Sequence, residues 1–98
     1  MLSKTEALEI VSKKLQEMRP SDPFVVVEKS TIERPFGWVF FYNSKKFVET
    51  GEFGDRLLGN GPVIVNKHNG SVEFLGSSRP PLEFVEEYER RLAEGDKP

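Results

Sequence analysis

The sequence predicts an α+β domain in which a helix near each end of the chain flanks a set of strands. Three observations carry this prediction. Apolar residues recur at helical spacing near both ends. The middle alternates short β-branched or aromatic runs with turns rich in Gly and Pro. Asn69-Gly70, between two apolar runs, is the strongest short-range signal of a β-hairpin. The 98 residues make one domain, 1–98.

The first helix is predicted to run from about residue 4 to residue 19. Ser3 and Glu6 fit a capping box, in which the Ser3 hydroxyl accepts from the Glu6 amide and the Glu6 carboxylate reaches back. Pro20 and Pro23 end the helix, because proline lacks an amide donor and disfavours helical geometry in the preceding residue. The apolar positions share one face: Ala7 or Leu8, Val11, Leu15 and Met18.

Two hairpins are predicted in the middle of the chain. The first joins a strand from residue 24 to about 32 with a strand from 37 to about 43, across a turn that contains Pro and Gly. The second joins residues 63–67 to residues 71–76. Together they supply the sheet of the domain.

The second of these strands is apolar on both faces. Because successive side chains of a strand point to opposite faces, Trp38, Phe40 and Tyr42 share one face, and Val39 and Phe41 share the other. Either something covers each face, or one of the faces binds a partner.

Residues 44–61 form a long connection, which is uncommon in a compact domain and is often functional. Phe47 and its neighbour would lengthen the sheet, and an acidic, Gly-rich part follows with Glu49, Glu52 and Asp55. In the alternative reading, large apolar residues of this segment fold over the sheet and complete the core. These residues are Phe47, Phe53, Leu57 and Leu58.

The closing helix is predicted to begin near Pro81 or Leu82, since proline suits a first helical turn, and to stop at Gly95. Acidic residues near its start and Arg90 and Arg91 near its end complement the helix dipole. Its apolar positions are Leu82, Val85, Tyr88 or Glu89, and Leu92.

Composition and motifs exclude several classes of function. Without cysteine there is neither a disulfide nor a thiolate metal site, and a net charge of −2 argues against a nucleic-acid partner. His68, the single histidine, has no nucleophile to activate. Glu49, Glu52 and Asp55 lack the pattern of a calcium loop. We therefore predict no catalytic residue, cofactor or metal.

The N-terminus has no apolar core of signal-peptide length, and no run of apolar residues approaches the length of a membrane span. The sequence thus predicts a cytoplasmic protein without a membrane partner.

A series of stretches, in their order and spacing, resembles a known family. They are residues 37–41, 46–51, 56–62, 63–67, 70, 75–77, 80 and 88–89. The family is that of the small bacterial proteins of the YrhB type, grouped with the immunity protein 35 domain, and the resemblance covers roughly residues 35–90. One small departure is Asn66, where Asp is often expected in the family.

The resemblance implies a helix, a four-stranded antiparallel sheet and a final helix. It also implies a non-enzymatic immunity role, in which a cytosolic protein binds and blocks a toxin. We expect both helices to pack on one sheet face, which leaves the other face, the long connection or the acidic helix surface for the toxin. Aromatic anchors with a charged rim are common at tight interfaces. The predicted partner-binding residues are the exposed members of Trp38, Glu49, Glu52, Phe53 and Asp55.

Three alternatives stay open at this point. The surplus of apolar surface also fits a chaperone-like or stress-associated protein-binding module. An enzyme or small-ligand binder would need a pocket between the sheet and the long connection, with convergent polar groups that the sequence does not reveal. A homodimer could form through an uncovered strand edge.

Overall fold

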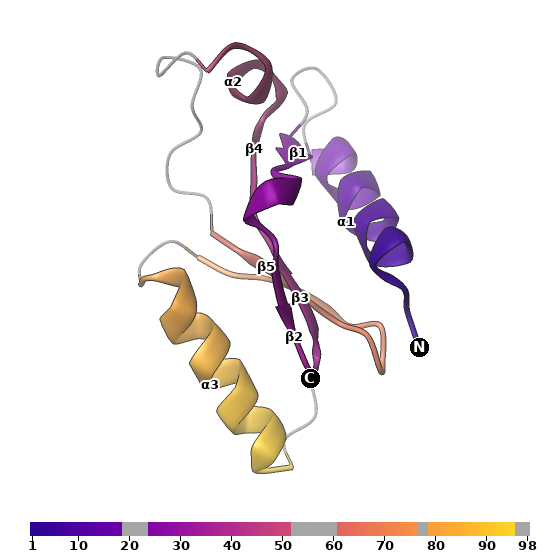
Figure 1. Ribbon diagram of the computed structural model, residues 1–98, viewed down its shortest axis with the longest axis vertical. Helices are drawn as coiled ribbons and strands as arrows, with labels where there is room; N and C mark the ends of the chain where they lie inside the picture. Colours follow the sequence, from indigo (N-terminus) through magenta and orange to yellow (C-terminus); the bar gives the residue numbers. More distant parts are fainter. Residues whose placement is uncertain (19–23, 52–60, 77–78, 96–98) are drawn as a thin grey trace.

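Figure 1 shows a computed structural model of the chain, which describes residues 1–18, 24–51, 61–76 and 79–95. A helix lies near each end and antiparallel strands lie between them, which confirms the predicted α+β class. In chain order the elements are α1 (Lys4–Met18), β1 (Phe24–Val26), the 3₁₀ helix η1 (Glu28–Ser30), β2 (Ile32–Arg34), β3 (Gly37–Phe40), β4 (Tyr42–Ser44), α2 (Lys45–Thr50), β5 (Val63–Asn66), β6 (Val72–Phe74) and α3 (Pro81–Ala93).

The described strands form two sheets. A four-stranded antiparallel sheet has the order β2-β3-β5-β6, and β1 pairs with β4 in a separate two-stranded sheet. The prediction of a single four-stranded sheet was therefore wrong. Val26 pairs with Tyr42 and Ile32 pairs with Val39, so residues 27–31 lie opposite a much shorter stretch of the partner strand. Helix η1 takes up this excess chain and divides the predicted long hairpin into two ladders.

The two long helices lie on opposite sides of the strands (Figure 1). The prediction that both pack on one sheet face was wrong. Since β3 is apolar on both faces, each face needs its own cover, and each helix supplies one. The alternation of side chains along this strand was predicted correctly. The core layer between α1 and the strands includes Ala7, Val11, Leu15, Trp38, Phe40, Tyr42, Val63 and Val65. The core layer between α3 and the strands includes Phe36, Val39, Ile64, Val85 and Tyr88, with Phe41 packed against them.

The predicted helix ends agree with the structure wherever they fall on described residues. The capping box of α1 is present: the Ser3 amide donates to the Glu6 carboxylate at 2.9 Å, and the Glu6 amide donates to the Ser3 hydroxyl at 3.1 Å. Helix α3 begins at Pro81, and Gly95 follows it with a φ of 81°. The predicted proline stop of α1 lies outside the described residues.

The second hairpin has its turn at the predicted place. Gly70 has a φ of 75°, and its amide donates to the carbonyl of Asn66 at 2.9 Å. The buried Asn66 side chain holds this turn, since its Oδ1 accepts from the amides of His68 and Asn69 at 2.9 and 3.3 Å. Its Nδ2 donates to the hydroxyl of Tyr88 at 3.1 Å, which ties the hairpin to α3.

Candidate partner-binding surface

Trp38 belongs to the core. Its side chain is 6% exposed and lies among residues of α1 and the inner strands. Its ring stacks on that of Phe40 with centroids 6.4 Å apart. The sequence pointed to the exposed members of its candidate set, and Trp38 is not one of them. In the described fold its large apolar area stabilises the packing of α1 on the sheet.

Glu49 lies exposed on α2, a helix where the sequence pattern had suggested an extension of the sheet. The Ser44 hydroxyl caps this helix by accepting from the Phe47 amide at 3.1 Å. Gly51 closes it in the left-handed conformation, and its amide donates to the Phe47 carbonyl at 2.7 Å. Val48, beside Glu49, is 44% exposed.

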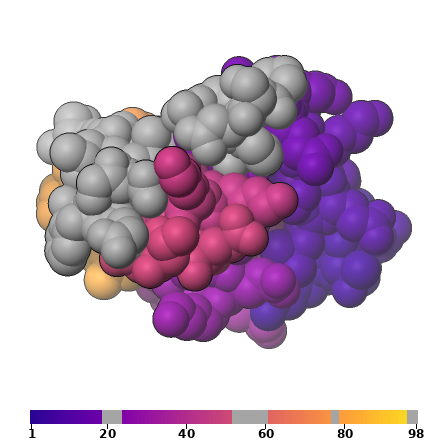
Figure 2. Space-filling view, turned by 90° about the horizontal axis from the view of Figure 1, so that it is seen from above, coloured from indigo at the N-terminus to yellow at the C-terminus, as the bar shows by residue number. Residues whose placement is uncertain are grey.

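Helix α2 therefore presents the exposed Val48 and Glu49 at one end of the molecule, together with the exposed Lys45 and Lys46 of its first turn. Figure 2 looks onto this end, where pink atoms that include α2 lie at the surface and the indigo atoms of α1 lie to their right. The other three predicted partner-binding residues, Glu52, Phe53 and Asp55, lie outside the described residues. Their role in partner binding stays a prediction.

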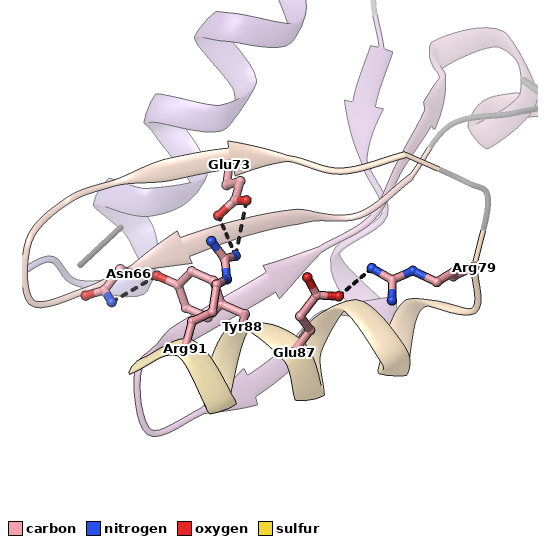
Figure 3. A network of polar contacts seen from close by, with 6 residues as sticks. All are labelled: Asn66, Glu73, Arg79, Glu87, Tyr88 and Arg91. Atoms are coloured by element: carbon pink, nitrogen blue, oxygen red, sulfur yellow. Dashed lines mark hydrogen bonds and ion pairs between the residues drawn. The ribbon is translucent and has the colours of Figure 1, made fainter. Parts of the chain in front are cut away.

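A second surface runs along the outer side of α3 and carries charge. Figure 3 shows Arg79, which precedes α3 in the chain, pointing to Glu87 on the helix, and the two side chains form an ion pair. The hydrogen bond from Arg79 and the charge of its guanidinium lower the pKa of the Glu87 carboxyl. The guanidinium of Arg79 also lies over the ring of Phe84, 4.6 Å from its centroid.

Next to this pair, α3 is held to strand β6. The guanidinium of Arg91 contacts both carboxylate oxygens of Glu73, at 3.3 and 3.4 Å (Figure 3). Arg91 also lies over the ring of Tyr88, 5.3 Å from its centroid. Together with the bond between Asn66 and Tyr88, these contacts fix α3 against the β5–β6 hairpin.

The acidic surface that the sequence predicted on the last helix is present. Glu83 and Glu86 are exposed, and in the described part of the chain no ion pair involves either carboxylate. A shallow, charged depression lies over this part of the helix. Its lining residues are Arg79, Glu83, Glu86, Glu87 and Arg90.

Within residues 1–18, 24–51, 61–76 and 79–95, no three His, Asp or Glu side chains gather in a way that could hold a metal ion. His68 is exposed, in the turn where it was predicted. Over the same residues, each helix is too short or too polar to cross a bilayer.

Fold and surface together define a small α+β domain whose accessible features are charged or apolar contact patches. The chain belongs to the immunity protein 35 family, which matches residues 5–91. It is 39% identical over 57 residues to YrhB of Escherichia coli (strain K12), which is described as an uncharacterized protein. That alignment covers 58% of this chain and 61% of YrhB, so the chain spans less than two thirds of this relative. No solved structure matches.

Sequence reasoning missed two features of these surfaces. Helix α2 had a usable signal, because Ser44 is a good N-cap residue and Gly51 is a good residue to follow a helix. The ion pair between Arg91 and Glu73 had none, because it joins two elements whose contact depends on which sheet face α3 covers.

Proposed function

We propose that this protein is a bacterial immunity protein that acts in the cytoplasm, where it binds and neutralises a toxin delivered by a competing or sister cell. It acts by occupying the toxin and catalyses no reaction. The observation that carries the proposal is membership of the immunity protein 35 family, which extends over residues 5–91. The partner in this proposal is a protein, with no nucleic acid, lipid or cofactor involved.

The described surfaces are compatible with this role. Exposed charge, as on Glu49, Glu83 and Glu86, speeds encounter with a basic partner and rejects acidic ones. Exposed apolar groups beside such charge, Val48 on α2 and Leu82 on α3, supply contact area. We include Glu52, Phe53 and Asp55 in the proposed partner-binding set because they follow α2 in the chain.

A chaperone-like role drew its support from a strand that is apolar on both faces. Helices α1 and α3 cover those faces, so this support is withdrawn. Within the described residues, the exposed large apolar side chains come from different parts of the chain and form no single sheet face. They are Met1, Met18, Val48, Phe74 and Leu82.

Co-expression tests the proposal directly. The toxin domain encoded beside this protein's gene is induced in a bacterial host with and without the protein, and colony survival is counted. We expect survival to be restored by at least about a hundredfold, because a tight stoichiometric inhibitor leaves very little free toxin. An unrelated toxin serves as the control and should still kill. Equal killing by the adjacent toxin with and without the protein would refute the immunity role.

A further inference from the structure

The four-stranded sheet has two edges, formed by β2 and β6. A sheet edge exposes backbone donors and acceptors that another chain can pair with, and natural proteins usually protect it with charge, proline or a bulge. The two edges of this sheet differ in how they are protected, and the difference indicates where a partner strand binds.

The hydrogen bonds that flank β6 show which of its backbone groups are free. The Asn66 amide donates to the Ser71 carbonyl at 3.0 Å, and the Leu75 amide donates to the Pro62 carbonyl at 2.9 Å. In an antiparallel ladder the bonding direction alternates, so residues 71, 73 and 75 bond to β5. The amide and carbonyl groups of Val72 and Phe74 then point away from the sheet, and no described residue pairs with them.

The edge at β2 is protected. By the same alternation only Glu33 directs its backbone groups outward there, since Ile32 and Arg34 bond to β3. Its exposed carboxylate, Pro35 in the following turn and the bulge at η1 each hinder the addition of a strand. Strand β6 has none of these devices at its outward positions.

The side chains of β6 specify the chemistry of a partner strand. Val72 packs at the margin of the core under α1. Phe74 is 37% exposed, and its ring meets that of Tyr42 edge-on, with the two ring centroids 6.2 Å apart. Glu73 faces the other side, where its side chain is 35% exposed and its carboxylate contacts Arg91. An added strand would therefore place apolar side chains beside Val72 and Phe74 and a basic one opposite Glu73.

A second copy of this chain fits the edge poorly in the register that would use the outward groups of both Val72 and Phe74. In the antiparallel register that pairs Val72 of one copy with Phe74 of the other, the two Glu73 residues stand directly opposite each other. Like charges at such a position destabilise a sheet. In the register that uses both outward residues, the edge therefore favours a different chain.

We propose that the free edge of β6 binds an extended segment of the toxin by strand addition, through the outward backbone groups of Val72 and Phe74. This inference rests on the proposed immunity function. The bound segment alternates apolar residues with a basic residue opposite Glu73. Backbone hydrogen bonds supply affinity in this mode, and the alternate side chains supply specificity.

Proline variants test the edge against the purified toxin domain encoded beside the gene. Phe74→Pro removes an outward amide donor and leaves the bonds of Glu73 and Leu75 to β5 intact. We expect binding at least about tenfold weaker for Phe74→Pro, and about twofold to fivefold weaker for Phe74→Ala, which keeps the amide. The matched control Glu33→Pro, on the opposite edge, should bind like the wild type. A folded Phe74→Pro variant with wild-type affinity would overturn the proposal.

If Phe74→Pro does not fold, hydrogen exchange of the wild-type protein tests whether the edge of β6 is the binding site. The amides of Val72 and Phe74 should exchange rapidly in the free protein and become protected by at least about a hundredfold in the complex. If the complex forms and both amides stay unprotected, the edge is not the binding site while the immunity role stands. If the wild-type protein does not bind the toxin domain at all, both proposals fail.

Discussion

Single residues of this domain are constrained by backbone contacts as much as by apolar packing. Gly37 begins β3 with a φ of 149°, and a Cβ atom there would lie 2.1 Å from the carbonyl oxygen of Val65 on β5. Asn66 shows a second kind of constraint, because its buried amide bonds two turn amides and the Tyr88 hydroxyl. An Asp at this position, as the family resemblance suggests, could accept from the same amides, with the Tyr88 hydroxyl turned to donate.

Replacing Gly37 tests the backbone constraint. We expect Gly37→Ala to lower the free energy of unfolding by at least about 2 kcal/mol, because β3 and β5 must move apart and the residue is strained at positive φ. Gly70→Ala is the matched control: its φ is also positive, at 75°, but nothing lies within 4 Å of the added Cβ. Gly70→Ala should lower the free energy of unfolding by about 1 kcal/mol. Urea unfolding measures both, and equal losses would show that the contact with Val65 is unimportant.

At the scale of elements, local signals fix the helix ends and tertiary contacts fix where each helix lies. The capping box of α1 satisfies two amides at the start of the helix, those of Ser3 and Glu6. The bonds that the Glu6 carboxylate accepts from Ser3, from the backbone amide first and the side chain second, lower its pKa from the ordinary 4.5. A lowered pKa in the folded state means that this cap contributes stability when the carboxyl is ionised.

The direction of the pKa shift of Glu6 determines how the stability depends on pH. The contribution of Glu6 is fully present above its ordinary pKa of 4.5 and is lost as the pH falls through the lowered value of the folded state. We expect Glu6→Gln to be less stable than wild type near neutral pH, with the difference shrinking in this acidic range. Glu9→Gln, on the same helix but outside the cap, should lose less near neutral pH. Thermal unfolding across a pH series measures both variants, and a Glu6→Gln difference that grows toward acid would contradict the assignment.

For the whole molecule, the features that the sequence predicts are those that depend on interactions between residues close together in the chain. The capping box of Ser3 and Glu6, the turn at Asn69-Gly70 and the alternation of Trp38 and Val39 all follow from local chemistry. The sheet face that each helix covers does not, because an apolar stripe on a helix fits either face of a strand that is apolar on both. The division of the first hairpin at η1 likewise depends on a register that sequence spacing leaves undetermined.

The candidate site was less predictable than the fold. Trp38 is a large aromatic residue on a strand, a residue type that is common at interfaces, but it is buried here because α1 covers that strand. Glu49 is exposed, but on a short helix that apolar periodicity cannot identify over so few residues. The free edge of β6 emerges from the strand order, since no motif marks which strand ends a sheet.

In the proposed immunity role, one molecule of this protein inactivates one molecule of toxin by staying bound to it. Titration of a fixed amount of the purified toxin domain encoded beside the gene, with its own activity as the readout, measures this directly. We expect the toxin activity to fall linearly with added protein and to reach its minimum at one equivalent, at any incubation time. Complete inactivation by a small fraction of an equivalent, progressing with time, would reveal catalysis, and undiminished activity at several equivalents would contradict the immunity role altogether.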